Sequence, residues 1–160
     1  MRLAEYTDYT LRVLMYCAAR PGQLVTIGEL AEHHGVSKNN LMKIVNDLAR
    51  QGMLETTRGR GGGLRLLKDP AEIRVGDVVR ASETDFRLVE CFDTDANECT
   101  LSAACRLKRL FGDALQAYFR ELDGATLADI TVPAVGRGSA RVVRVLRPGR
   151  PKLEAAKHHA

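Results

Sequence analysis

Apolar side chains recur every three or four residues near the start of the chain, and this spacing predicts an amphipathic helix over residues 8–19. Thr7 stands just before this run and is placed to cap the N-terminus of the helix, and the Pro-Gly pair at 21–22 ends it. Two further apolar residues, 24–25, predict a short strand. The chain is therefore expected to begin with a helix that buries one face, followed by a short strand.

Two further helices follow, with a single tight turn between them. Thr26 stands three residues before Glu29, which is the capping-box pattern, at the head of a helix predicted over residues 27–34. A glycine supplies the turn, and Ser37 is placed to cap a helix over residues 38–51. Two helices joined in this way form the helix-turn-helix pattern.

Strand-like segments at residues 53–57 and 64–67 are joined by a loop of arginine and glycine alone, residues 58–63. Together they predict a β-hairpin, and a helix-turn-helix followed by a hairpin wing is a winged helix. Glycine-rich loops also cradle phosphates in nucleotide enzymes, but no Lys-Ser/Thr pair and no helix follow these glycines. The loop is therefore interpreted as a wing, and the plain alternative is a flexible hairpin tip.

The strongest helical pattern lies in the second half of the chain. Its apolar stripe consists of Leu107, Leu110, Phe111, Ala114, Leu115, Tyr118, Phe119 and Leu122. These positions share one face of a helix, which Gly124 ends. Such a stripe is suited to pack against a second copy of the chain or, alternatively, against the chain's own head.

The predicted fold class is mainly α with a small β-hairpin wing. We expect a winged helix-turn-helix head over residues 1–70, a cysteine-bearing loop and long helix over residues 71–132, and a basic tail over residues 133–160. The tail is rich in arginine, glycine and proline, a composition typical of disorder.

The net charge of +4 is unevenly distributed. Residues 37–68 hold seven basic and two acidic side chains, residues 69–132 seven basic and thirteen acidic, and residues 133–160 seven basic and one acidic. Only the first basic block coincides with the pattern of a folded DNA reader.

No apolar run approaches the roughly 20 residues that span a bilayer. Residues 1–12 lack the apolar core of a signal peptide, so a cytoplasmic protein with no membrane partner is expected.

Polar and basic side chains gather at the start of the helix predicted over residues 38–51 and in the wing. The candidate DNA-binding residues are Ser37, Lys38, Asn39, Asn40, Lys43, Arg58 and Arg60. Asparagine reads adenine edges, lysine reaches guanine or phosphate, and arginine suits a narrow minor groove. We therefore expect double-stranded DNA as a partner, the alternative being a solvated helix face that contacts protein.

Three of the four cysteines, Cys91, Cys99 and Cys105, lie within fifteen residues of each other. The segment between the first two is too polar to form part of a core, which argues against three buried, inert thiols. Reduced cytoplasmic thiols favour metal binding or redox chemistry over disulfides. Neither the paired knuckles of zinc modules nor the classical ferredoxin spacings are present. Cys17 differs, because it lies in an apolar helical run and is interpreted as a packing residue.

Three thiolates leave a zinc ion or an iron–sulfur cluster one ligand short. The histidines are His33, His34, His158 and His159, and none lies near the cysteine segment in sequence. The fourth ligand therefore has to come from elsewhere, and a carboxylate is the favoured type.

A set of short motifs is distributed over residues 1–132. The motifs are residues 1–3, 6–9, 11–12, 36–46, 58–66, 74–80, 99–101, 105–108, 122–124 and 126–129. In this combination they resemble the NsrR-type nitric-oxide-sensing repressors, members of the iron–sulfur winged-helix regulators that also include IscR. The tail lies outside the resemblance.

The resemblance implies a homodimer with one iron–sulfur cluster in each subunit, and makes the long striped helix the dimerisation helix. It implies that the three loop cysteines ligate the cluster and that Asp8 from the partner subunit is the fourth ligand, with Arg12 nearby. IscR-type relatives use a histidine three residues after the last cysteine to hold a two-iron cluster. Lys108 occupies that position here, so a [4Fe-4S] cluster is favoured over [2Fe-2S].

By this resemblance the chain is a transcriptional repressor whose operator binding is switched by nitric oxide. One rival is a general iron–sulfur or redox-sensing regulator, and another is a zinc-stabilised DNA-binding or interaction protein without a cluster. The alternative role for Asp8 is a carboxylate that interacts with the helix dipole. An enzyme or electron-transfer protein is disfavoured, because no Ser/His/Asp or Cys/His constellation is evident.

Overall fold

The computed structural model describes residues 2–93, 95–100 and 105–132, so the tail predicted over residues 133–160 lies outside the described residues. The elements, in chain order, are α1 (Glu5–Ala18), α2 (Ile27–His34), α3 (Lys38–Arg50), β1 (Leu54–Thr57), β2 (Gly63–Leu66), the 3-10 helix η1 (Pro70–Glu72), α4 (Val75–Ser82), the 3-10 helix η2 (Glu90–Phe92), α5 (Arg106–Gly124) and α6 (Leu127–Ile130). The predicted fold class is confirmed, because the described chain is mainly helical with one two-stranded hairpin.

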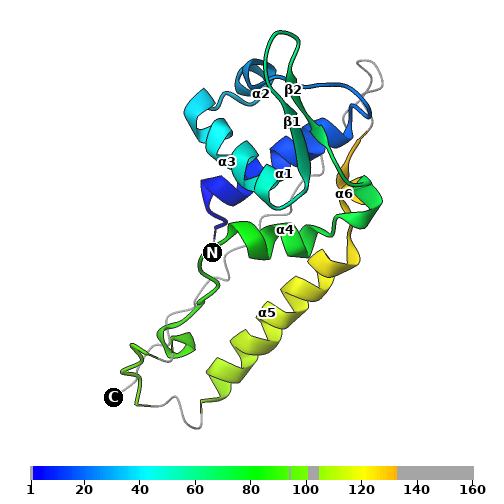
Figure 1. The fold of residues 1–160 in the computed structure, drawn as a ribbon. Helices are drawn as coiled ribbons and strands as arrows, with labels where there is room; N and C mark the ends of the chain where they lie inside the picture. The colour runs from blue at the N-terminus through cyan, green and yellow to red at the C-terminus, as the bar shows by residue number, and fades with distance from the viewer. Residues whose placement is uncertain (1, 94, 101–104, 133–160) are drawn as a thin grey trace, which may run out of the picture.

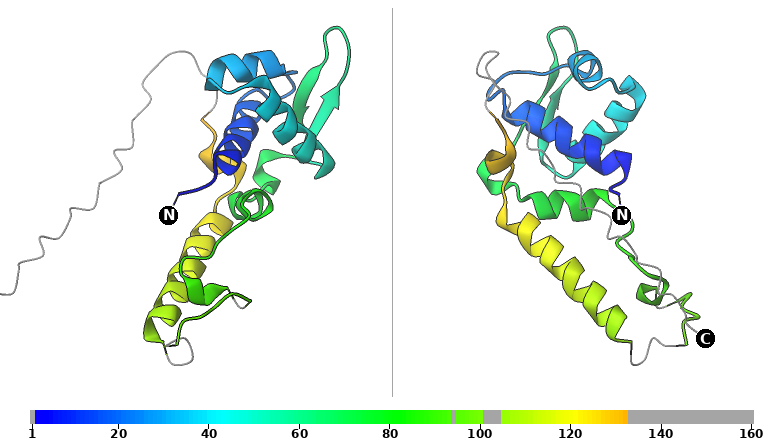
Figure 2. Two further views of the ribbon diagram at one scale, coloured as in Figure 1. Left: turned by 90° about the vertical axis from the view of Figure 1, so that its left-hand side faces the viewer. Right: turned by 180° about the vertical axis from the view of Figure 1, so that it is seen from behind.

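The molecule has a head and an arm. We call residues 2–82 and 125–132 the head, and residues 83–93, 95–100 and 105–124 the arm. In Figure 1 the segment that follows α4 runs away from the head, and α5 returns to it. Figure 2 shows from two further sides that α5 extends away from the head. The start of α5 therefore lies at the end of the arm farthest from the head, and its last turns lie against α4.

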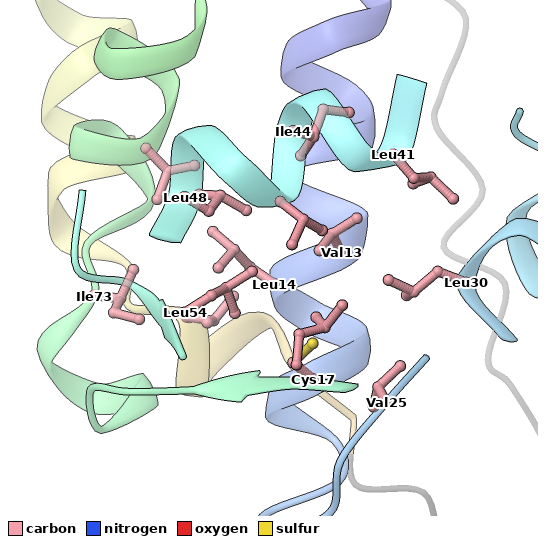
Figure 3. Packing of buried hydrophobic residues seen from close by; sticks show 14 of the residues in the cluster. Val13, Leu14, Cys17, Val25, Leu30, Leu41, Ile44, Leu48, Leu54 and Ile73 are labelled. Atoms are coloured by element: carbon pink, nitrogen blue, oxygen red, sulfur yellow. The ribbon is translucent and has the colours of Figure 1, made fainter. Parts of the chain in front are cut away.

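The core of the head is built around α1. The buried side chains labelled in Figure 3 come from α1, α2, α3, β1 and the segments beside them: Val13, Leu14, Cys17, Val25, Leu30, Leu41, Ile44, Leu48, Leu54 and Ile73. Burying one aliphatic side chain of this kind stabilises the fold by about 1.5–3 kcal/mol relative to leaving it exposed. The apolar spacing of the first three helices is thus explained by one shared core.

The start of α1 differs from the prediction. The helix begins at Glu5, and Thr7 is fully buried within its first turn, so the prediction that Thr7 caps the helix is wrong. Thr7 lies on the face that carries the apolar residues of α1, and burial of this face outweighs the preference of threonine for a cap. The backbone amide of Ala4, ahead of the helix, donates instead to the carboxylate of Glu83 at 2.8 Å.

The turn between α2 and α3 forms as predicted. The Thr26 hydroxyl accepts the Glu29 amide at 3.1 Å, and the Glu29 carboxylate accepts the Thr26 amide at 2.7 Å, which confirms the capping box. Gly35 has a φ of 66°, a left-handed conformation that favours glycine. The Ser37 hydroxyl accepts the Asn40 amide at 3.3 Å and starts α3. These local bonds fix where one helix ends and the next begins.

The wing is a close-packed hairpin. β1 and β2 pair antiparallel, and Leu64 on β2 also bridges Val25, so the strand predicted at 24–25 is reduced to one bridging residue. A side chain at Gly62 would place its Cβ 2.2 Å from the carbonyl oxygen of Thr57. Glycine is therefore required at this position by lack of space.

We expect Gly62→Ala to lower the free energy of unfolding by about 1–3 kcal/mol, because the added methyl group forces the backbone at Thr57 to move. Denaturant unfolding of the variant and the parent measures the difference. Gly28→Ala in α2 is the control, since its methyl group meets only the Thr26 hydroxyl at 3.7 Å and alanine favours a helix more than glycine does. Equal stability of Gly62→Ala and the parent would contradict this account of the wing.

One polar cluster joins the arm to the head. The Arg80 guanidinium donates to both carboxylate oxygens of Asp123, at 2.6 and 2.7 Å, and lies 4.3 Å from the centre of the Phe119 ring. Arg74 donates to the Asp123 carbonyl at 2.6 Å. Gly76 leaves the room for this contact, because a Cβ there would lie 1.9 Å from Asp123 Oδ1. The last turn of α5 is thereby fastened to α4.

The start of the apolar stripe on α5 is not covered by the described chain. Leu107 and Leu110, near the start of the helix, are 53% and 63% exposed. Phe119, near its end, packs edge-on against Phe86 with ring centres 4.9 Å apart. The head and its neighbouring segment therefore cover one end of the stripe, and the start of the helix presents leucines to solvent.

Candidate nucleic-acid interface and metal centre

Helix α3 has two contrasting faces, because its apolar residues recur at helical period. The buried face consists of Leu41, Ile44, Val45 and Leu48. The candidate DNA-binding residues at the start of α3 are all exposed: Ser37, Lys38, Asn39, Asn40 and Lys43. The structure thus brings these five side chains together on the first turns of the helix and their outer surface.

The candidate arginines of the wing, Arg58 and Arg60, lie in the loop between β1 and β2 and are exposed. Farther down the hairpin, Arg65 stands opposite Glu55 and its Nε donates to the Glu55 carboxylate at 2.7 Å. Glu55 therefore neutralises Arg65 on the strands and leaves Arg58 and Arg60 in the loop without this acidic partner.

The candidate cations have no acidic partner among the described residues. None of the ion pairs found there includes Lys38, Lys43, Arg58 or Arg60. Neutralising phosphates with such side chains releases counterions, which is the main source of sequence-independent affinity for DNA. The head therefore presents the charges that a DNA backbone requires.

Tyr6, which the sequence pattern did not single out for DNA binding, lies beside Lys43. The Lys43 ammonium is 5.6 Å from the centre of the Tyr6 ring, within cation–π range. The Tyr6 hydroxyl donates to the carboxylate of Asp47, which also binds Arg50. Burial and this hydrogen bond raise the pKa of Tyr6 to about 12, so the hydroxyl remains a donor at neutral pH. The same bond holds the pKa of Asp47 below its usual range.

Loss of one basic contact should weaken DNA binding in a salt-dependent way. We expect Lys38→Ala and Arg60→Ala each to lower the slope of log affinity against log salt by about one unit per lost phosphate contact. Asn40→Ala should instead relax sequence preference, at a cost of about 1–3 kcal/mol. Fluorescence anisotropy at several salt concentrations measures both effects, with Arg120→Ala on α5 as the control. Unchanged affinity and preference in all three variants would remove these residues from the interface.

The three cysteines of the predicted metal centre occupy the arm. Cys91 lies in η2 and is 7% exposed, whereas Cys99 and Cys105 are half-buried. None of the three forms a disulfide with another described residue. Cys105 directly precedes the 19-residue helix α5.

The segment between the first two cysteines is folded by its own acidic side chains. The Asp93 carboxylate accepts the backbone amides two and three residues ahead, at 3.0 and 3.3 Å, and also binds Arg87. The Glu90 carboxylate accepts the amide of Glu98 at 2.8 Å. The polar composition of this segment therefore has a structural reason, because carboxylates bind backbone groups where no apolar core is available.

The donor types fit an iron–sulfur cluster, because such clusters are held by cysteine thiolates. The described part of the single chain does not form a closed set of ligands. Within residues 2–93, 95–100 and 105–132, no three His, Cys, Asp or Glu side chains are placed to hold a metal ion together. Three cysteines in one polar part of the chain thus match the group in chemistry, and their mutual arrangement stays a prediction.

Asp8, the candidate fourth ligand, lies on the head. Arg12, one turn farther along α1, donates from Nε to Oδ1 at 3.1 Å, and its Nη2 lies 2.7 Å from Oδ2. Both side chains are nearly half exposed, at 45% for Asp8 and 47% for Arg12. Helix α1 belongs to the head, whereas the start of α5 lies at the far end of the arm (Figure 1). The structure therefore does not bring Asp8 to the cysteines of its own chain.

Cys17 has a different environment from the other thiols. It is 3% exposed and points into the core of the head (Figure 3). Burial raises the pKa of its thiol to about 12, so it stays protonated. The prediction that Cys17 is a packing residue is confirmed.

Comparison with known proteins assigns the family. The sequence model of the Rrf2 family, described as iron-dependent transcriptional regulators, matches residues 3–133. The chain belongs to the Rrf2 family. The match includes the head and the arm and ends where the basic tail begins.

Two similar relatives are regulators from bacilli. The HTH-type transcriptional regulator NsrR of Bacillus subtilis strain 168 is 51% identical over 131 residues, which cover 81% of this chain and 90% of the relative. The regulator of the same name from Bacillus licheniformis is 48% identical, with coverage of 81% and 92%. The similarity therefore extends over nearly the whole length of each relative.

Solved structures show the same fold at lower identity. IscR of T. potens superposes with a TM-score of 0.64 at 23% identity, covering 81% of this chain and 85% of that one. Oxidised CymR of Staphylococcus aureus gives a TM-score of 0.64 at 24% identity, covering 82% and 98%. The Rrf2 protein described here is thus a DNA-binding transcriptional regulator of winged-helix fold and not an enzyme.

Among the described residues, no helix combines the length and the apolar character needed to cross a membrane.

Proposed function

We propose that this Rrf2 protein is a homodimeric cytoplasmic repressor whose binding to operator DNA is switched by nitric oxide at an iron–sulfur cluster. The observation that carries the proposal is that one chain joins three cysteines in the arm, none in a disulfide, to a head whose candidate cations are exposed and form no ion pair with another described residue. The relatives named NsrR support the nitric-oxide signal, because the sequence motifs resemble nitric-oxide-sensing repressors of that type.

In this proposal Cys91, Cys99 and Cys105 hold the cluster from one subunit. Asp8 of the partner subunit completes the ligand set, which is consistent with the place of Asp8 on α1 in the head, whereas Cys91 and Cys105 lie in the arm. Carboxylate oxygen is a hard ligand and holds iron less firmly than soft thiolate does. When bound, the cluster supplies an iron that nitric oxide can attack at this weaker position. Lys108, in place of a histidine, favours a [4Fe-4S] cluster.

In this proposal, Arg12, Arg80 and Asp123 hold other parts of the protein in place. Arg12 holds the Asp8 carboxylate in one orientation through its two contacts. Arg80 and Asp123 fasten α5 to the head, so a movement of the arm is passed to the DNA-reading surface. A dimer of such heads reads two half-sites at a fixed separation. Loss of a ligand shared between subunits therefore changes the separation of the heads and releases DNA.

The test is an anaerobic titration with nitric oxide. Anaerobically purified protein should be brown, its visible absorbance should fall as nitric oxide is added, and its affinity for operator DNA should fall in parallel. A colourless protein that contains zinc would support the zinc-stabilised alternative. A brown protein that releases DNA on oxidation but not with nitric oxide would support a general redox sensor.

Asp8→Ala should give a cluster that binds but is labile. Water or an added thiol can occupy the vacated position, so we expect brown protein that loses its colour faster than the parent and reacts with nitric oxide at a different stoichiometry. Absorbance decay under dilute chelator measures this lability.

Glu5→Ala is the matched control for Asp8→Ala. Both carboxylates lie in the first turn of α1, where interaction with the helix dipole contributes about 0.3–1 kcal/mol. If the two variants lose similar stability and both keep the parent spectrum and stoichiometry, Asp8 acts only on the dipole and is not a ligand.

A further inference from the structure

One side chain of α1 reaches the DNA-reading face of α3. Tyr6 donates its hydroxyl to the Asp47 carboxylate, and its ring lies 5.6 Å from the Lys43 ammonium. Asn40, Lys43 and Asp47 follow one another at spacings of three and four residues, so they lie along one face of the helix. A tyrosine from outside the recognition helix is thus in contact with two consecutive members of this row.

Asp47 is placed to compete for Lys43. Opposite charges four residues apart are neighbours on a helix surface and pair readily. In the described chain, however, Lys43 forms no ion pair, and the Asp47 carboxylate is bound by the Tyr6 hydroxyl and by Arg50. The Asp47 side chain is 21% exposed and that of Arg50 78%. The carboxylate is therefore turned toward the head, where Tyr6 meets it.

We propose that Tyr6 is a positioning residue for DNA binding, whose hydroxyl holds Asp47 away from Lys43 and keeps the Lys43 ammonium available to a DNA phosphate. The proposal rests on the assignment of Lys43 to the DNA interface. Arg50 alone does not replace Tyr6, because its exposed side chain is free to follow the carboxylate to a new position. Without the hydroxyl, Asp47 is left with Arg50 and Lys43, the two cations whose charges act on its carboxylate, and both lie on its own helix.

Tyr6→Phe tests the proposal, since it keeps the ring beside Lys43 and removes only the hydroxyl. We expect binding of a short mixed-sequence DNA duplex to weaken several-fold, and the salt slope to fall by about one unit, as for the loss of one phosphate contact. Tyr9→Phe, on the same helix, is the matched control and should leave both quantities unchanged. Circular dichroism and thermal unfolding establish that each variant is folded.

Rescue separates positioning from a general structural effect. Asp47→Asn removes the charge that would compete for Lys43, so the double variant Tyr6→Phe/Asp47→Asn should regain the affinity and salt slope of Asp47→Asn alone. A double variant as weak as Tyr6→Phe would overturn the proposal, because the hydroxyl would then act through something other than Asp47.

Lys43→Ala separates the proposed role of Tyr6 from the assignment of Lys43 to the DNA interface, on which that role rests. If Lys43→Ala leaves affinity and salt slope unchanged, the assignment of Lys43 to the DNA interface is wrong. If Lys43→Ala lowers both quantities and Tyr6→Phe changes neither, only the role of Tyr6 is overturned. In the expected case Tyr6→Phe has no further effect when it is added to Lys43→Ala, because the contact it protects is already absent.

Discussion

Replacing Cys91, Cys99 or Cys105 with alanine is expected to give a colourless protein whose DNA binding no longer responds to nitric oxide. Each of the three thiolates is a required ligand in the proposed centre, and no spare thiol is at hand. The fourth cysteine, Cys17, is 3% exposed in the core of the head, and burial raises its pKa to about 12. Visible absorbance, iron and sulfide analysis of anaerobically purified protein measure the loss.

Cys17→Ala is the control for these variants. It removes a buried sulfur, so thermal stability should fall, but the colour and the response to nitric oxide should remain those of the parent. An alanine variant of any arm cysteine that keeps the full spectrum would remove that cysteine from the ligand set. If all three variants and the parent are colourless, the cluster itself is absent.

The parts of the fold that sequence predicts best are those set by local bonds. The starts of α2 and α3 follow from hydroxyls of Thr26 and Ser37 that accept amides three residues ahead. Thr7 is also a hydroxyl residue that precedes a helical pattern, like Thr26 and Ser37. It lies inside α1 and does not cap it, because its face of the helix is buried in the head. Thr126 forms a second capping box at α6, and sequence analysis did not identify this helix because four residues are too few to show a period.

The candidate site also has features that the local sequence predicts and contacts that it does not predict. Clusters of cations and of cysteines are recognisable from residue type and neighbours alone, which is why the candidate DNA-binding residues and the three cysteines could be singled out from the sequence. The contacts that join α1 to α3 and α4 to α5 link residues far apart: Tyr6 and Asp47 are separated by 41 residues, and Arg80 and Asp123 by 43. No local pattern records such pairs, since each depends on how two helices pack.

A charge on the exposed part of the α5 stripe is expected to produce a folded monomer. Leu110 is 63% exposed in the single chain, so Leu110→Asp leaves the head and its core unchanged. In a dimer that buries the stripe, an unpaired carboxylate costs several kcal/mol. Sedimentation velocity over a range of protein concentrations measures the change. Leu67→Asp is the control, because Leu67 is 59% exposed but lies just after the wing, away from α5.

The monomer produced by Leu110→Asp also tests the origin of the fourth ligand. If Asp8 reaches the cluster only from the partner subunit, loss of the dimer removes it, and the cluster of the Leu110→Asp protein should be as labile as that of Asp8→Ala. A well-folded dimer from both Leu107→Asp and Leu110→Asp would show that the stripe is not the subunit interface. A monomer whose cluster is as stable as in the parent would show that the ligand set is complete within one chain, because a ligand from the partner subunit is lost with the partner.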